Sequence, residues 1–308
     1  MRIGALSAQL AALAILPIVV VGVINRVKSR WAGRKGPPIL QLGFDLRRLL
    51  RKRAVYSATT TGVFQLAPWL ALAAALTAAL IVPIVVAPVL AFRLDFVAFA
   101  YAWGLGRVAL MLGALDTGSS FEGMGASREA TFGALLEPAL FLVAVALCAD
   151  TGAGSLAGGL ALRPHDPASI ALWVASIAAL LIVVTVECAR MPVDDPTTHL
   201  ELTMIHEVMI LDHSGPDLAV LEYTAGLKLV TGLALVANLI NPVPRAAGEL
   251  AGAAGVVGMI LALAVVIGCV ESLTARLKLR VVPQYIAIAL GAGVVALLAT
   301  AWRLGAGT

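Results

Sequence analysis

The chain has 308 residues, of which 60% are hydrophobic and 13% charged, and its mean hydropathy is +0.97. Soluble globular proteins have about 45–50% apolar and about 25% charged residues. The composition therefore excludes a soluble domain and predicts an integral membrane protein. The formal net charge is +4, and the 3 cysteines have no CxxC spacing, so neither a disulfide framework nor a cysteine-ligated cluster is indicated.

Eight apolar runs are long enough to cross the hydrocarbon core as helices. They cover about 4–24, 63–91, 95–115, 132–149, 168–186, 219–240, 251–270 and 284–302. Lipid offers the backbone no hydrogen-bond partners, so helices are required, and the runs lack the alternation of barrel strands. We therefore expect an all-α, polytopic fold in which residues 1–308 form a single integral membrane domain.

The basic residues predict the orientation of this domain, because cytoplasmic loops are enriched in Lys and Arg. The predicted loops at about 25–62, 116–131, 187–218 and 271–283 contain 15 of the 22 Lys and Arg. With these large loops in the cytoplasm, both termini face outside. No internal repeat, Walker motif, GxGxxG or HExxH occurs, so an ATP-driven pump or a self-contained hydrolase is not supported.

The first predicted loop is strongly basic, with Asp45 as its single acid. Its segment "LQLGFDLRRLLRKR" places leucines at helical spacing opposite arginines: Leu42, Leu46, Leu49 and Leu50 against Arg47, Arg48, Arg51 and Arg53. This pattern predicts an amphipathic helix at the membrane interface. Two interpretations stay open: the helix anchors to acidic lipid headgroups, or it docks an acidic partner together with Arg34 and Lys35 of the "RKGPP" turn.

Ionisable residues inside lipid are costly, and they tend to face a bundle interior or a wet cavity. Five lie within the predicted spans or at their margins: Arg107, Glu137, Glu187, Glu222 and Lys228. As buried ion pairs they would neutralise one another. Alternatively, acids near the same depth on three consecutive spans would line a hydrated proton path, because a carboxyl group in a low dielectric exchanges protons near neutral pH.

The predicted loop at about 187–218 is acidic, with Arg190 as the only base among seven acids between Glu187 and Asp217. We expect Arg190 to hold Glu187 or Asp194 in place. The pattern of residues 198–213 predicts an amphipathic helix near the interface, with Asp195 as its N-cap and Pro196 opening the helix.

Three histidines of this segment, His199, His206 and His213, recur every seven residues. Seven residues are two helical turns, about 10.5 Å, so neighbouring histidines cannot bind one ion together, and no metal site is expected.

The same loop carries a resemblance to a known family. Its ExxRxPxDxxxxxxEL pattern is formed by Glu187, Arg190, Pro192, Asp194, Glu201 and Leu202. The pattern resembles the signature loop of the NADH-quinone oxidoreductase subunit 1 family, the proximal membrane subunit of respiratory complex I. "RKGPP" and "EGMGASREATFGALLEPAL" are similar to other parts of that family. Residues 192–222 are similar to the formate hydrogenlyase subunit 4 branch, and Thr197 and His199 stand where quinone-linked members often have acids.

The resemblance implies a prokaryotic inner- or plasma-membrane subunit without a redox or catalytic centre or a bound cofactor of its own. It would anchor cytoplasmic hydrogenase-like large and small subunits and an iron–sulfur subunit, beside antiporter-like membrane subunits. Iron–sulfur clusters and a nickel–iron centre would belong to those partners. Arg190, Asp194, Asp195, Glu201 and Glu207 would form the coupling loop, and the buried ionisable residues the proton path. The alternatives are a quinone-site subunit of a complex I-like oxidoreductase and, from another class, a free-standing ion transporter.

Overall fold

The computed structural model describes residues 2–85, 87–194, 205–243 and 248–306, and every regular element in these ranges is a helix. Within them, 8 helices are long and apolar enough to cross a membrane. These are α1 (Arg2–Trp31), α3 (Gly62–Ile81), α4 (Asp95–Asp116), α5 (Ser120–Thr151), α7 (Pro167–Glu187), α9 (Gly215–Ile240), α10 (Glu249–Leu273) and α11 (Val282–Ala306). The predicted all-α, polytopic fold is confirmed.

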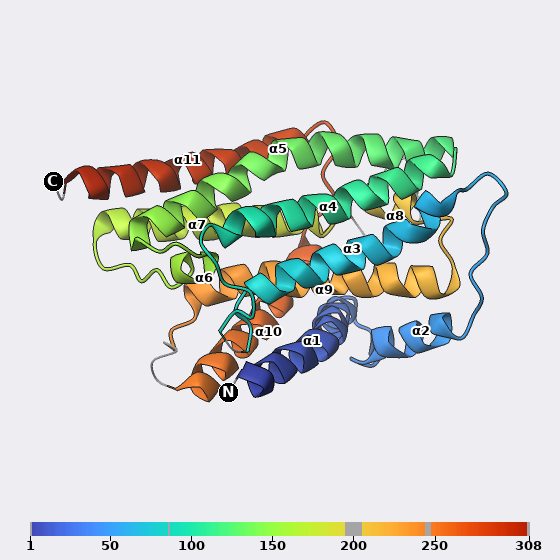
Figure 1. Cartoon of the computed structure of the whole chain (residues 1–308), viewed down its shortest axis with the longest axis horizontal. Helices are drawn as coiled ribbons and strands as arrows, with labels where there is room; N and C mark the ends of the chain where they lie inside the picture. Colours follow the sequence, from blue (N-terminus) through green and yellow to red (C-terminus); the bar gives the residue numbers. More distant parts are fainter. Residues whose placement is uncertain (1, 86, 195–204, 244–247, 307–308) are drawn as a thin grey trace.

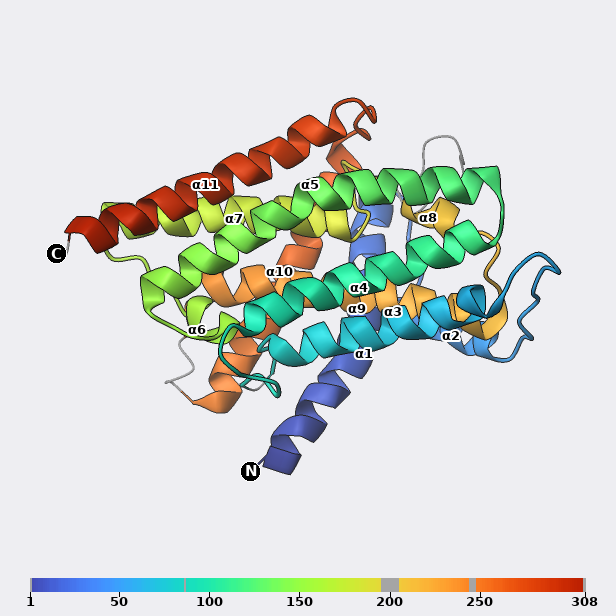
Figure 2. The ribbon, with the colours of Figure 1, turned by 45° about the horizontal axis from the view of Figure 1, so that its top comes forward.

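The spanning helices form an elongated bundle. Helices α3, α4, α5, α7, α9 and α11 run lengthwise, and α1 and α10 pack on each other as a tilted pair against α9 (Figures 1 and 2). The short helices α2 (Gln41–Leu50) and α8 (His206–Met209) lie at one end of the bundle, and α6 (Leu156–Gly159) lies at the other (Figure 1). We refer to these as the α2 end and the α6 end.

Helix α2 confirms the amphipathic helix that the basic loop predicts. It packs against α9 and α1 and buries Leu49, while Leu50 is 59% exposed. The expectation that all four leucines share the inner face was therefore wrong for Leu50, because consecutive helical residues are about 100° apart.

Two predicted spans have different limits in the structure. Helix α3 ends at Ile81 rather than near residue 91, because Pro83 disfavours a helical conformation at Val82, whose ψ is 130°. Helix α5 begins at Ser120, so the predicted loop 116–131 is almost entirely helical. This polar first part of α5 packs against α8 and α4, which stabilise it as a helix.

The predicted cytoplasmic loop 187–218 also differs from expectation. Residues 189–191, 193 and 194 are buried. Their backbone is satisfied from several sides: Arg190 N donates to Thr185 O at 2.8 Å, and Leu277 N donates to Pro192 O at 2.8 Å. The segment after α7 therefore enters the protein interior.

Only the single-turn helix α8 is present in the described part of the predicted helix 198–213. Because α8 ends at Met209, His206 and His213 do not lie on one helix. His199 and the predicted helix start at Asp195 and Pro196 lie outside the described residues.

Candidate functional site

Five ionisable side chains from four helices meet inside the bundle, and we call them the central cluster: Arg107 of α4, Glu129 and Glu137 of α5, Glu187 of α7 and Lys228 of α9. Arg107 Nη2 lies 3.1 Å from Glu137 Oε1 and 3.5 Å from Glu187 Oε2. Arg107 Nε lies 3.8 Å from Glu129 Oε1. Lys228 Nζ donates to Glu187 Oε1 at 2.8 Å. The contacts thus form a continuous row from Lys228 through Glu187 and Arg107 to the two acids of α5.

The central cluster is unevenly buried. The side chains of Glu187, Arg107 and Lys228 are 3%, 7% and 9% exposed, whereas that of Glu137 is 45% exposed on the flank of the bundle. Three carboxyl groups face two cations, so the cluster becomes electrically neutral when it holds one proton. Isolated charges in a low dielectric are costly, and the two bases cannot match all three acids as ion pairs.

The structure brings together four of the five ionisable residues that the sequence analysis selected, and it separates Glu222 from them. Glu222 has Asp45 and Arg48 of α2 as its charged neighbours. It precedes Lys228 by six residues, which is about 9 Å along the helix and on a different face.

Glu129 was missed because span 4 was predicted to begin only at residue 132. The signal that could have found it is the spacing of Glu129, Gly133 and Glu137, which puts all three on one helix face.

A cavity of about 420 Å³ lies near the α2 end, between α1, α2, α8 and α9. Arg190, His206, Glu207, His213 and Glu222 contribute polar groups to its wall. His206 also lies near Glu187 and Lys228 of the central cluster. Burial, together with the positive charge of Lys228, lowers the pKa of His206 to about 4. A neutral imidazole, able both to donate and to accept a hydrogen bond, therefore lies in the cavity wall near the cluster.

His213 is the second histidine of the cavity wall. Its ring stacks on Phe64 of α3 with a centroid distance of 3.9 Å and an interplanar angle of 4°. Burial lowers the pKa of His213 to about 4, and within the described residues its Nδ1 has no hydrogen-bond partner. Nearby, Tyr56 Oη donates to Asp217 Oδ2 at 2.7 Å, and this hydrogen bond raises the pKa of Tyr56. These contacts fix the start of α9 against α3.

Arg190 pairs with a residue that the sequence analysis did not select. Its Nη1 lies 3.4 Å from Glu271 Oε1 of α10, and Lys28 Nζ of α1 lies 3.0 Å from Glu271 Oε2. The prediction that Arg190 holds Glu187 or Asp194 was therefore wrong. The fold brings the ends of α1 and α10 to the segment after α7, and no local spacing in the sequence records that contact.

Asp194 organises the rest of the predicted coupling loop. Its Oδ1 lies 2.9 Å from Arg276 Nη2, and its Oδ2 accepts from the backbone N of Ile205 at 3.0 Å and of His206 at 3.2 Å. Glu207 lines the cavity. Asp195 and Glu201 lie outside the described residues. Across the described part of the chain, no three potential metal ligands lie close together.

The predicted docking residues are all on the surface of the α2 end: Arg34, Lys35, Arg47, Arg48, Arg51 and Arg53 are exposed. Arg48 Nη2 lies 3.1 Å from Asp45 Oδ1 one turn away. Such an exposed pair contributes little to stability, so the surface keeps a large positive charge.

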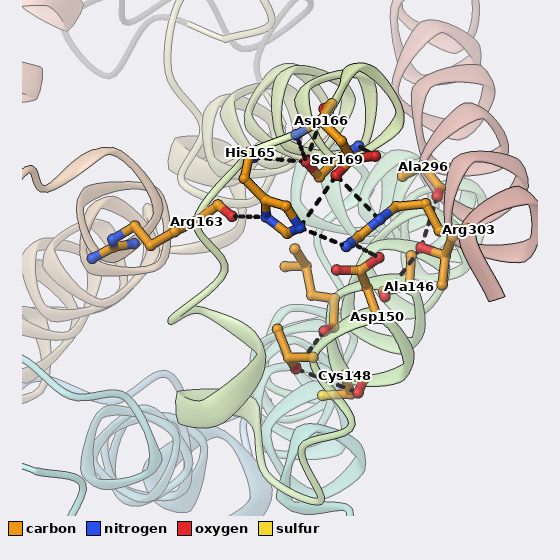
Figure 3. A network of polar contacts seen from close by, with 12 residues as sticks. Ala146, Cys148, Asp150, Arg163, His165, Asp166, Ser169, Ala296 and Arg303 are labelled. Atoms are coloured by element: carbon orange, nitrogen blue, oxygen red, sulfur yellow. Dashed lines mark hydrogen bonds and ion pairs between the residues drawn. The ribbon is translucent and has the colours of Figure 1, made fainter. Parts of the chain in front are cut away.

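A second polar network, which the sequence analysis did not predict, lies at the α6 end (Figure 3). Arg303 of α11 forms an ion pair with Asp150 of α5, and its Nε lies 3.3 Å from Asp166 Oδ1 at the start of α7. His165 Nε2 lies 3.2 Å from Arg303 Nη2. The network joins three helix ends and holds the end of α11 against α5 and α7.

Comparison with known proteins places this architecture in a family. The family model described as NADH dehydrogenase matches residues 5–302. The chain belongs to the NADH dehydrogenase family. This confirms the resemblance that the loop motif carries, and makes the chain a multi-pass membrane protein of that family.

Among the curated relatives of this NADH dehydrogenase family protein are a hydrogenase component and a formate hydrogenlyase subunit. Hydrogenase-4 component C of Escherichia coli strain K12 is 31% identical over 244 residues, which cover 78% of this chain and 75% of the relative. Formate hydrogenlyase subunit 4 of the same organism is 28% identical over 275 residues, which cover 85% of this chain and 87% of the relative. The predicted formate hydrogenlyase branch is confirmed.

The fold of this NADH dehydrogenase family protein is also found in a chain of a solved respiratory complex. A chain of the membrane-bound sulfane sulfur reductase, an archaeal respiratory membrane complex, superposes with a TM-score of 0.81 at 18% sequence identity. The match covers 96% of this chain and 98% of that chain.

Proposed function

We propose that this protein is the membrane-anchoring and proton-coupling subunit of a complex I-like, formate hydrogenlyase-type hydrogenase complex. The two curated relatives, a hydrogenase component and a formate hydrogenlyase subunit, support the type of complex. The central cluster supports the coupling role. Family membership favours a subunit of a larger complex over a free-standing transporter.

The observation that carries the proposal is the row of contacts from the cavity into the bundle. The cavity of about 420 Å³ supplies water and protons at the α2 end. His206 lines this cavity and lies near Glu187, and Arg107 Nη2 lies 3.5 Å from Glu187 Oε2 and 3.1 Å from Glu137 Oε1. A proton that enters from the cavity is received by Glu187, and the charge of Arg107, which keeps its own proton, couples Glu187 to the acids of α5.

The row ends on the flank of the bundle rather than at the α6 end. Glu137 is 45% exposed on a spanning helix, where lipid contact with a carboxylate is costly. A second membrane subunit that covers this face and offers a polar group would remove that cost. The proposed proton path therefore continues sideways into an antiporter-like partner.

The segment after α7 is suited to transmit changes from a cytoplasmic redox arm. Arg190 and Asp194 connect this buried segment to α10 and to the residues that follow it, through Glu271 and Arg276. Glu187 ends α7 immediately before the segment. A charge change in the arm that shifts the segment would alter the environment of Glu187. The iron–sulfur clusters and the nickel–iron centre belong to the partner subunits in this proposal.

The experiment that tests the proposal replaces Glu137 or Glu187 by glutamine in the complete complex. Gln keeps the shape and hydrogen bonding of Glu but holds no exchangeable proton. We expect normal assembly and a loss of ion pumping linked to electron transfer, both measured on the same membranes. Glu122→Gln is the matched control, because Glu122 is a buried acid of α5 outside the central cluster.

Two results would contradict the proposal. Normal pumping in both variants would show that protons do not pass through Glu137 and Glu187. Failed assembly in both variants would show instead that the acids are structural ion-pair partners.

The alternative of a quinone-site subunit has one observation in its favour. The cavity near the α2 end combines apolar groups such as Val21, Leu42 and Leu218 with polar ones, as a quinone site requires. Sensitivity of electron transfer to quinone-site inhibitors would favour this alternative, and resistance would favour the hydrogenase-type complex.

A further inference from the structure

A separate cavity of about 260 Å³ lies at the α6 end, far from the central cluster. Its wall is formed by the segment that follows α3, by α6 and by the last turn of α9 with the residues after it. Most of the wall is apolar and comes from prolines, alanines and Leu160. Among the described residues, Arg163, Asn238 and Asn241 are its polar residues, so this part of the wall contains one positive charge and no acid.

Arg163 supplies a charge that no carboxylate neutralises among the described residues. Its Nη1 donates to Leu162 O at 2.9 Å and to Asn238 O at 3.4 Å, which are both backbone carbonyl oxygens. Figure 3 shows its guanidinium group pointing away from the network of Asp150, Asp166 and Arg303. The two acids of that network, Asp150 and Asp166, form their ion pairs with Arg303 rather than with Arg163.

The position of the cavity corresponds to the headgroup level of a membrane. It lies where α3 ends at Ile81 and α9 ends at Ile240. Two exposed apolar side chains lie within ten residues of cavity-lining residues in the sequence: Phe92 is 50% exposed and Leu250 is 86% exposed. Phosphate groups of phospholipids lie just outside the hydrocarbon core, at the level of such helix ends.

The geometry points to a binding site for an anionic phospholipid, whose phosphate contacts Arg163 and whose glycerol and first methylene groups lie against the apolar wall. Arginine binds phosphate through charge-assisted hydrogen bonds, and the exposed side chain of Arg163 is accessible to a headgroup. The bound lipid covers the junction of α3, α6 and α9. This role is independent of the proposed proton path.

The experiment measures phospholipid retained by the purified complex after delipidation and incubation with palmitoyl-oleoyl phosphatidylglycerol, by native mass spectrometry. Arg163→Gln should weaken retention about tenfold, because it removes a charge-assisted contact. Ala157→Phe fills the cavity without changing charge and should also reduce retention. Arg93→Gln is the matched control, since Arg93 also lies at the α6 end without a carboxylate partner among the described residues but does not line the cavity. It should retain lipid as the unsubstituted protein does.

Three outcomes would overturn the assignment. Unchanged lipid retention in Arg163→Gln would show that Arg163 does not bind the phosphate. Equal losses in Arg163→Gln and Arg93→Gln would indicate general surface charge rather than a site. Finally, inorganic phosphate that displaces the lipid at equal concentration would show that the cavity recognises the free anion and not the lipid.

Discussion

The guanidinium group of Arg107 occupies the space that a side chain at Gly133 would need. A Cβ atom at position 133 would lie 1.7 Å from Arg107 Nη1 and 2.7 Å from its Cζ. Gly133 lies midway between Glu129 and Glu137 on one face of α5, so the missing side chain lets Arg107 of α4 reach both acids.

Gly133→Ala should therefore displace Arg107 from the central cluster. The steric conflict should cost about 1–3 kcal/mol of stability, although alanine in a helix is otherwise favoured over glycine by up to about 1 kcal/mol. Thermal unfolding of the purified protein and proton-coupled turnover of the complex are the measurements, and both should fall. Gly258→Ala in α10 is the control, because nothing lies within 4 Å of its Cβ position. If the Gly133→Ala variant is as stable and active as this control, then the observed position of Arg107 is not required for stability or turnover.

Lys228 and Glu187 should behave as a buried pair. Lys228→Met leaves a carboxylate without its 2.8 Å partner, which should cost roughly 3–5 kcal/mol if Arg107 does not compensate. Adding Glu187→Gln to Lys228→Met should restore much of the stability but not ion pumping. The measurement is a double-mutant cycle on thermal stability, with pumping assayed in parallel. Additive stability losses would mean that the two side chains act independently.

Arg190→Ala should destabilise the junction of α1, α10 and the segment after α7. Glu271 is completely buried and would keep Lys28 as its partner, so we expect a partial loss of about 1–3 kcal/mol. The Lys28→Ala, Arg190→Ala double variant should lose more than the sum of the single variants, because it leaves Glu271 unpaired among its described contacts. Arg280→Ala, at an exposed position near the same end, is the control for the removal of a positive charge. Unchanged assembly in the double variant would contradict this role of the two bases.

The protein should become less stable as the pH falls from about 6.5 towards 4. His213 has a pKa of about 4 in the folded protein, against an ordinary value of about 6.5. In this range the unfolded chain binds a proton that the folded protein does not, so acid favours unfolding. His213→Phe keeps the stacking on Phe64 and should reduce the drop in melting temperature between pH 7.5 and pH 5. An equal drop in His213→Phe and the unsubstituted protein would show that His213 is not responsible.

Charge reversal on the basic surface of α2 should show whether this surface docks a partner or anchors the protein to lipid. Reversal of Arg47, Arg48, Arg51 and Arg53 to glutamate should weaken binding of an acidic cytoplasmic arm at least about tenfold, while this subunit stays in the membrane. Pull-down of the arm from solubilised membranes measures the effect. Arg93→Glu, at the opposite end of the bundle, should have none. Recovery of the intact complex from the charge-reversed variant would show that this surface does not dock the arm and would favour the lipid anchor.

The sequence by itself determined that this protein is folded in a membrane and that its fold is all-helical. Apolar runs of membrane-spanning length can satisfy their backbone only as helices, so the number of spans followed directly from composition. The amphipathic spacing around Leu49 predicted α2, because helical periodicity is a local property. The loop motif from Glu187 to Leu202 was sufficient for the family. Four members of the central cluster were also identifiable, since an ionisable residue inside a span is conspicuous.

Only the tertiary structure decided which of these residues meet. Glu129 joins the cluster because the polar start of α5 continues the helix while packed on α4 and α8, a contact that local patterns do not contain. Glu222, although it lies in a span, faces α2 instead of the cluster. Glu271 is the partner of Arg190 because α10 returns to the segment after α7, 81 residues along the chain. Ion pairs of this kind depend on distances between helices, and those distances are set by how the whole bundle packs.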